Sequence, residues 1–441
     1  MAIPFSKTPR YAIGACCTLL HTGFGTVYAW SFFQTMLSRE YGWSSTETVT
    51  AFAVAMFFWG LSAGVGGLVL PRMGPRALAL VGSGCFAVGY LVAALALEMG
   101  DIDLFYLGYG VLGGIGIGAG YVTPVVTVAK WFPRRRGLAT GTVVMGFGIG
   151  ALVLSKIVGP FFVAITGGEL PLVFLLLGVF FAVVLVPCSL VLRNPDTPEP
   201  DPGSSGAKVK PARQPLLPYI MSGSFVVLWV VFFTHVAAGI SVIGFQSELL
   251  QEIWGLADPA LDSIVLAEYG ATLIAVSSVC NGLGRLFWAW LSDRIGRVAV
   301  YRVLLGSQLI VFGLLMSQTN PWIFGALVCY VLLCYGGGWA TMPSLIIEVF
   351  GSVNMPKIYG GVLTGAAAAG VVGPLIVGYF KDIYPDRAVM YCLLLGILML
   401  GAGYVVSFLL SDERMRLGRP TIARTLARQG IAAPAAGGPH G

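Results

Sequence analysis

Charged residues are scarce in this sequence. Asp, Glu, Lys and Arg together make up 10% of the 441 residues, whereas 57% of the residues are hydrophobic. Soluble globular domains usually carry about 25% charged residues. Together with a mean hydropathy of +0.85, this scarcity excludes an ordinary soluble domain and indicates a polytopic membrane protein.

Motifs for catalysis and for cofactor binding are also missing. The sequence has no phosphate-binding loop and no plausible catalytic triad. Its 8 cysteines lie in apolar segments without metal-ligand spacing, so we expect buried thiols and no metal site. Residues 108–113 match GxGxxG, but no strand precedes them and they lie within an apolar run, where small residues favour close helix contacts. The sequence therefore predicts neither an enzyme nor a cofactor.

Long apolar runs take up most of the chain. Each has about 20 to 30 residues, which is enough to span a bilayer, and backbone groups in lipid must be satisfied within a helix. The runs cover residues 11–37, 46–70, 77–97, 104–130, 137–165, 170–192, 217–249, 264–291, 298–317, 322–348, 358–380 and 388–410. The sequence thus predicts an all-α membrane protein with twelve transmembrane helices.

Basic residues are distributed unevenly between the two sides of these helices. If the N-terminus is cytoplasmic, 21 of the 26 Lys and Arg residues fall on the inner side or in cytoplasmic segments. The positive-inside rule then predicts a cell-membrane protein with both termini in the cytoplasm. This rule explains the net charge of +6, so we expect contact with membrane lipid and no nucleic-acid binding. The first run is too long for a cleavable secretory signal, and we expect an uncleaved anchor.

One segment divides the chain into two similar halves. Residues 193–216 are rich in Pro, Gly and charge, and they predict a flexible cytoplasmic linker between six-helix bundles at residues 1–192 and 217–411. The tail, residues 412–441, is predicted to be disordered. Residues 70–76 (LPRMGPR) resemble residues 292–297 (SDRIGR). Two repeated bundles predict a monomer whose halves rock about a central site.

One charge lies deep within the eighth run. Arg285 and Asn281 are four residues apart, which places both side chains on one helical face. Charged residues resume at Asp293, so at about 1.5 Å per residue Arg285 lies on the order of 12 Å inside that boundary, near the midplane of the bilayer. An arginine is costly at this depth, so we expect it to face a cavity and to bind an anion.

Four short motifs resemble a known family. The turn Asp293-Arg294-x-Gly296-Arg297 resembles the loop typical of the major facilitator superfamily, and we expect it to take part in conformational change. Residues 25–31 (GTVYAWS), 130–141 (KWFPRRRGLATG) and 281–285 (NGLGR) resemble the oxalate/formate antiporter family and its bacterial monocarboxylate relatives of the L-lactate type. The resemblance implies two six-helix bundles and transport by alternating access.

The family's functional residues carry over unevenly. The resemblance implies that Arg285 contacts the substrate carboxylate. Oxalate exchangers carry a second cation, a lysine in helix eleven, where this sequence has Ala367 or an adjacent alanine. One fixed cation leaves the second charge of a dicarboxylate uncompensated at a cost of several kcal/mol, which favours a monoanion. Asn281 stands where eukaryotic monocarboxylate transporters usually have an aspartate, so the usual proton carrier is missing.

Aromatic residues at the depth of Arg285 are candidates for the same site. Tyr121 and Trp339 each lie nine residues before the inner end of their runs, and Tyr335 lies one turn from Trp339. Tyrosine hydroxyls can bond a carboxylate, and an indole can pack on a short carbon chain. Tyr28 is a further candidate. The alternative is that these side chains only pack the helices.

Three residues are candidates for proton coupling. His21 and His235 both lie within apolar runs, and histidine titrates nearest to physiological pH. The alternative is a neutral histidine bonded to a helix carbonyl. Glu268 lies near a helix end, where solvation is the simpler explanation. Lys156 lies toward the outer end of the fifth run, where it would either snorkel or attract anions.

The sequence therefore predicts a secondary transporter of small organic monocarboxylates such as lactate or pyruvate, with a proton as co-substrate. The anion would pair with Arg285 and accept hydrogen bonds from Asn281 and Tyr121. The nearer alternative is an oxalate/formate-type antiporter in which Lys156 or a protonated histidine supplies the second cation. A non-transporting membrane sensor is the alternative from another class.

Overall fold

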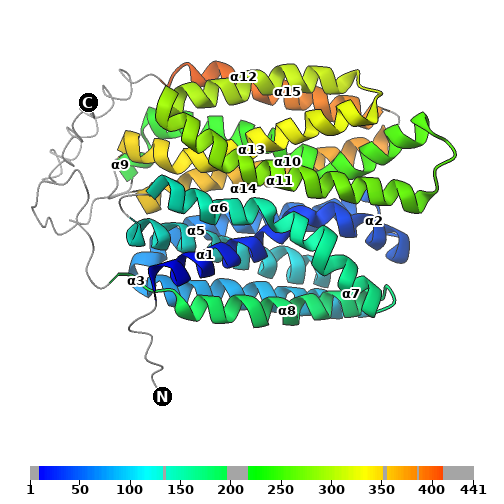
Figure 1. Ribbon diagram of the computed structural model, residues 1–441, viewed down its shortest axis with the longest axis horizontal. Coiled ribbons are helices and arrows are strands. Elements are labelled where there is room, and N and C mark those ends of the chain that lie inside the picture. Colours follow the sequence, from blue (N-terminus) through cyan, green and yellow to red (C-terminus); the bar gives the residue numbers. More distant parts are fainter. Residues whose placement is uncertain (1–8, 133–135, 196–216, 351–354, 385–386, 411–441) are drawn as a thin grey trace, which may run out of the picture.

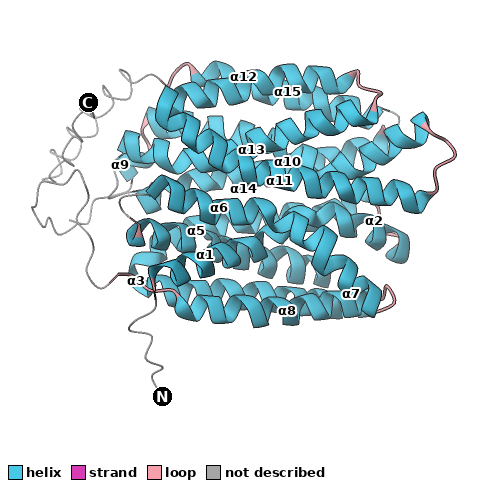
Figure 2. Ribbon diagram, in the orientation of Figure 1, coloured by secondary structure: helices cyan, strands magenta, loops and turns pink. Residues whose placement is uncertain are grey.

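The computed structural model describes residues 9–132, 136–195, 217–350, 355–384 and 387–410. Every regular element within these ranges is a helix, which confirms the all-α prediction (Figure 2). Most of the predicted linker, residues 196–216, and the predicted tail at residues 412–441 lie outside the described residues.

The first half of the chain is built from six membrane-length helical segments, some of them interrupted. Short 3-10 or π-helical turns (η1, η2 and η4) join successive α-helical pieces. The elements are α1 (Arg10–Gly25), η1 (Thr26–Ala29), α2 (Trp30–Tyr41), α3 (Ser45–Met99), α4 (Ile102–Phe105), η2 (Tyr106–Leu112), α5 (Gly113–Trp131), α6 (Arg136–Val153), η4 (Leu154–Val158), α7 (Gly159–Ile165) and α8 (Leu170–Val191). Such turns relax helical geometry locally, and they recur at hinges and functional sites.

The second half repeats this arrangement with fewer interruptions. Its elements are α9 (Leu217–Ile220), α10 (Gly223–Ala257), α11 (Ser263–Ile295), α12 (Arg297–Met316), α13 (Pro321–Phe350), α14 (Met355–Ile383) and α15 (Ala388–Ser407). The two halves lie side by side, the first drawn from blue to green and the second from green to red (Figure 1). Asp293 and Arg294, which the sequence places in a charged turn, belong to the last helical turn of α11, and the chain turns at Gly296.

Eleven helices in the described part of the chain are long and apolar enough to cross a membrane. One of them, α3, has 55 residues and contains two of the predicted runs, which are separated by a kink at the predicted turn. Gly74 interrupts it with φ 78° and ψ 165°, a backbone conformation that glycine adopts readily. Gly296, at the matching turn of the second half, has φ 89° and ψ 148°. The twelve predicted spans are therefore consistent with the structure.

The outer surface of the helices is apolar. Val183, Ile310 and Leu398 are 67%, 69% and 62% exposed, and many other large apolar side chains are exposed along the helices. Water would disfavour such a surface, whereas lipid tails solvate it well. The chain is a multi-pass membrane protein.

Small residues let the two halves approach closely. A Cβ atom at Gly64 in α3 would lie 3.3 Å from the carbonyl oxygen of Gly360 in α14, and one at Gly148 in α6 would lie 2.8 Å from the Cα of Gly282 in α11. In lipid, helices associate mainly through such close packing. The α3/α14 and α6/α11 contacts thus hold the halves together around the centre of the molecule.

This packing predicts how one added methyl group at the α6/α11 contact changes the melting temperature. We expect Gly148→Ala to lower the melting temperature of the purified protein, because α6 and α11 must separate and overpacking costs about 1–3 kcal/mol. Gly313→Ala in α12 is the matched control, since no atom lies within 4 Å of a Cβ built there. It should melt at or slightly above the wild-type temperature, as alanine is the better helix former. Equal melting temperatures for both variants would contradict this account of the interface.

Candidate functional site

Arg285 lies at the contact between the two halves and is completely buried. Its Nη1 donates a hydrogen bond to the carbonyl oxygen of Val144 in α6 at 2.9 Å, and its Nε donates to Oδ1 of Asn281 at 3.4 Å. The guanidinium carbon lies 5.6 Å from the centre of the Phe147 ring. Its Nη2 makes no hydrogen bond. The protein thus holds Nη1 and Nε of the guanidinium, whereas Nη2 has no hydrogen-bond partner.

No carboxylate of the described residues pairs with this arginine. Among the described residues, the ion pairs are Arg297–Asp293, Arg297–Glu348 and Lys381–Glu248. Arg285 is also the one Lys, Arg, Asp or Glu side chain in the described part of the chain that is fully buried. A buried charge without a counterion costs several kcal/mol, so the site is suited to an anionic ligand.

The aromatic candidates belong to one cluster of rings that includes Phe147, over which the Arg285 guanidinium lies. Tyr121, Tyr335 and Trp339 are fully buried. Trp339 stacks on Trp59 of the other half with ring centres 5.0 Å apart and an interplanar angle of 6°. The Tyr121 ring packs against both indoles, at 5.4 Å from Trp59 and 5.8 Å from Trp339. The sequence reasoning missed Trp59, although it lies eleven residues before Leu70 and the same depth argument would have found it.

Several polar atoms around Arg285 lack partners. The hydroxyls of Tyr28 and Tyr335 bond each other across the two halves at 2.8 Å. The hydroxyls of Tyr121 and Tyr359 have no partner at normal hydrogen-bond distance, but they lie within longer polar contact of each other, and the Tyr121 hydroxyl within such contact of Arg285. Tyr359 was not among the predicted site residues. Unpaired buried polar atoms are rare in proteins and point to a missing ligand or water.

The two buried histidines occupy equivalent positions in the two halves. Nε2 of His21 lies 2.9 Å from the carbonyl oxygen of Tyr121, and Nε2 of His235 lies 3.2 Å from that of Tyr335. His235 follows His21 by 214 residues, and Tyr335 follows Tyr121 by the same number of residues. A carbonyl only accepts, so both Nε2 atoms carry hydrogen. These bonds fit the alternative of a neutral histidine on a helix carbonyl.

The histidines differ at their second nitrogen. Nδ1 of His235 lies 3.4 Å from Nε2 of Gln308 and can accept its hydrogen, whereas Nδ1 of His21 has no partner. The ring of His21 also stacks on Tyr121 with centres 4.7 Å apart. His21 is therefore the histidine with a free acceptor beside the site.

The remaining candidates lie away from the arginine. Glu268 is exposed near the first turns of α11. Lys156 donates a hydrogen bond to Thr272 at 2.9 Å, and Thr272 precedes Arg285 by 13 residues, about 20 Å along the helix. Ala367 packs against Gly60, where a Cβ atom would come within 2.5 Å of the alanine methyl group. A lysine at position 367 would not fit this contact.

The charged turn at the end of α11 is held by its own side chains. Arg297 pairs with Asp293 at 3.2 Å and also with Glu348 of α13. The Arg294 guanidinium lies 4.0 Å from the centre of the Trp290 ring. These contacts tie the Gly296 turn to α13 within the second half.

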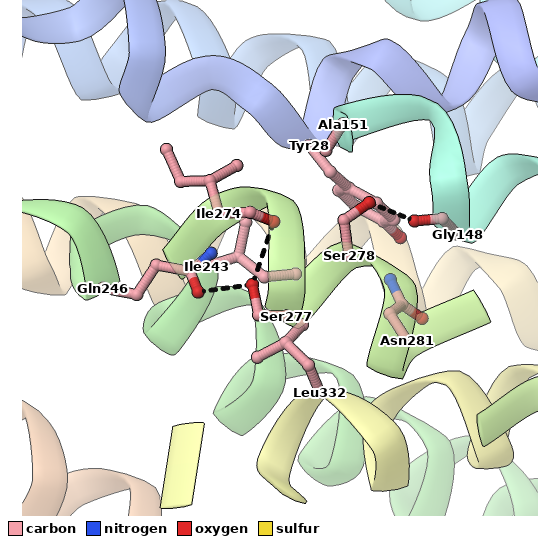
Figure 3. A pocket seen from close by; sticks show the side chains of 10 residues that line it. All are labelled: Tyr28, Gly148, Ala151, Ile243, Gln246, Ile274, Ser277, Ser278, Asn281 and Leu332. Atoms are coloured by element: carbon pink, nitrogen blue, oxygen red, sulfur yellow. Dashed lines mark hydrogen bonds between the residues drawn. The ribbon is translucent and has the colours of Figure 1, made fainter. Parts of the chain in front are cut away.

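A small cavity adjoins Asn281 on the side toward the start of α11 (Figure 3). Its volume is about 10 Å³, room for roughly one water molecule. Residues of both halves line it, namely Tyr28, Gly148, Ala151, Ile243, Gln246, Ile274, Ser277, Ser278, Asn281 and Leu332. The cavity and Arg285 thus share Asn281.

Comparison with known proteins assigns the family. The sequence matches the family model of the Major Facilitator Superfamily over residues 15–267 and 253–435. The chain belongs to the major facilitator superfamily. Its resemblance to that family is thereby confirmed, and with it the expected two-bundle helical fold.

Relatives within the superfamily include transporters of organic anions. The chain is 24% identical to the oxalate:formate antiporter of Oxalobacter formigenes over 79% of each chain. It is 27% identical to human monocarboxylate transporter 11, over 84% of this chain and 76% of the relative. A crystal structure of the nucleoside transporter NupG shares the fold, with a TM-score of 0.63 at 12% identity and coverage of 90% and 98%.

The unpaired charge makes a prediction about stability. We expect Arg285→Met, without ligand, to melt at or above the wild-type temperature, because removing an uncompensated buried charge outweighs the loss of the bond to Val144. Arg302→Met is the control, since Arg302 is only partly buried, bonds the Leu410 carbonyl and lies over Phe408. The control should melt lower. A large loss of stability in Arg285→Met would show that Arg285 is a structural residue.

Proposed function

We propose that this member of the superfamily is a secondary active transporter of small organic monocarboxylates, of the lactate or pyruvate type. The observation that carries the proposal is the unpaired Nη2 of Arg285. This buried cation has no carboxylate partner among the described residues. Guanidinium and carboxylate match in a bidentate fork. A bound monocarboxylate would neutralise the site and lower the cost of closing the two halves around it.

The number of cations favours one carboxylate over two. Oxalate brings two charges, and a second buried cation would be needed to compensate the second one. Lys156 bonds Thr272, which lies about 20 Å along α11 from Arg285, and the Ala367–Gly60 contact leaves no room for a lysine. The names of both relatives, the oxalate:formate antiporter and monocarboxylate transporter 11, agree with a carboxylate ligand. Of the two, the single cation favours the monocarboxylate.

We infer that a proton accompanies the anion. Asn281 cannot carry it, so another group must do so. His21 is better placed than His235, because its Nδ1 is free and its ring stacks on Tyr121, and Glu268 could receive the proton at the surface. The proposal includes a monomer in the cell membrane, with both termini in the cytoplasm and no enzymatic activity.

Anion exchange is the second candidate for the coupling mode. No described acidic residue replaces the anion next to Arg285 when the site empties. An empty carrier must then close around an uncompensated charge, which slows its return. Exchange of one anion for another avoids that state.

Uptake into proteoliposomes distinguishes these modes. With L-lactate as the probe, we expect an inward proton gradient to stimulate uptake, and pyruvate but not oxalate to inhibit it. Uptake that requires an internal anion, ignores the gradient and is blocked by oxalate would establish the exchanger instead. Absence of both uptake and counterflow, in a protein that still binds lactate, would favour the sensor.

The arginine itself is tested by a conservative change. We expect Arg285→Lys to reduce lactate uptake at least 100-fold with normal folding, because a lysine keeps the charge but loses the planar fork. Lys156→Met is the control for a cation outside the site, and it should retain most of the uptake. Near-normal lactate uptake by Arg285→Ala would contradict the proposed site.

A further inference from the structure

Two buried amides face the cavity beside Asn281. Gln246 and Asn281 are 2% and 1% exposed, and neither amide nitrogen donates a hydrogen bond to a described residue. Both residues line the same cavity, Gln246 from α10 and Asn281 from α11 (Figure 3). A buried NH₂ group without an acceptor loses the free energy of its bonds to water. The cavity therefore requires an oxygen acceptor.

The other polar groups of the cavity are already bonded. The Ser278 hydroxyl donates to the carbonyl oxygen of Gly148 at 2.6 Å and accepts from the Leu152 amide at 3.1 Å. The Tyr28 hydroxyl bonds Tyr335. Among the ten lining residues, the amides of Gln246 and Asn281 are thus the side-chain donors left for a ligand.

Ser277 fixes the orientation of the Gln246 amide. Its hydroxyl donates to Oε1 of Gln246 at 2.8 Å and also lies 3.1 Å from the carbonyl oxygen of Ile274. Because a hydroxyl that donates to Oε1 holds the oxygen end of the amide, the NH₂ end is left to the cavity. Ser277 is therefore a positioning residue.

The cavity and the arginine lie within reach of one small molecule. Side chains on a helix lean toward its N-terminus, so the guanidinium of Arg285 reaches back to Asn281, as the 3.4 Å contact shows. Ser277 lies one turn, about 6 Å, beyond Asn281. The volume of about 10 Å³ suits one oxygen-sized group. Ile243, Ile274 and Leu332 close the cavity with apolar surface.

We propose that Gln246 and Asn281 form a second subsite, which binds an oxygen of the transported acid other than its carboxylate oxygens. The inference rests on the proposed function, in which Arg285 holds the carboxylate. The subsite selects acids with an oxo or hydroxyl group near the carboxylate. An unsubstituted acid leaves both amides unpaired and is rejected on that account.

The test compares acids that differ only by this oxygen. Dissociation constants are measured by calorimetry on the purified full-length protein for pyruvate against propionate and for glyoxylate against acetate. The wild-type protein should prefer the oxo acid of each pair by about 10-fold or more. We expect Gln246→Leu to remove most of this preference by weakening binding of the oxo acids, with little effect on propionate and acetate. Ser277→Ala should reduce the preference less.

Gln308→Leu is the matched control. Gln308 is also fully buried, but it lies on α12, bonds its own helix at Leu304 and does not line the cavity. Its variant should keep the wild-type preference. An unchanged preference in Gln246→Leu, or equal weakening of all four acids, would overturn the subsite, and the cavity would then hold a structural water at most.

Arg285→Ala separates this inference from the proposed function. Loss of binding of all four acids in Arg285→Ala, together with an unchanged preference in Gln246→Leu, would overturn the subsite alone. If Arg285→Ala binds the acids as well as the wild type, or if the wild type binds none of them, the proposed function and the subsite both fail.

Discussion

The desolvation of one guanidinium governs the centre of this molecule. Water would solvate Arg285 fully. Here the guanidinium donates hydrogen bonds to one backbone carbonyl and one side-chain amide oxygen, and it lies over the Phe147 ring. Those contacts compensate only part of what is lost. Under the proposed function, an anion beside the unpaired Nη2 would compensate the rest. Binding and closure would then meet a single electrostatic requirement.

Close helix packing keeps water away from Arg285. Glycines at the α3/α14 and α6/α11 contacts bring backbones together, so that the site is completely shielded when the halves meet. Bulkier residues would leave gaps for water, and water would screen the arginine and weaken its hold on a ligand. The many glycines of the sequence therefore support the binding chemistry as well as the fold.

The sequence predicted the fold well because composition and run length constrain a membrane protein strongly. It also located Arg285, because a lone charge stands out in an apolar run. It did not find Tyr359 or Gln246, since an aromatic or amide in an apolar run gives no sign of which helix face meets the other half, whereas Trp59 was missed although it lies at a similar depth to Arg285. The break in α3 at Gly74 falls between the predicted runs at residues 46–70 and 77–97, so this turn was predicted as well. The roles of the site residues stay predictions.

The matching turns at Gly74 and Gly296 allow the helical stretch before Gly74 in α3 to be aligned with α11 position by position. Eleven residues before each glycine stand Ala63 and Arg285, and fifteen before stand Trp59 and Asn281. The two halves therefore share these positions and a buried histidine bonded to a helix carbonyl, but among the described residues the fully buried charge lies in the second half. Under the proposed function, a bound anion would stay with the second half throughout the transport cycle, and the first half would present apolar surface to it. The asymmetry between the two repeats would then decide which half carries the ligand.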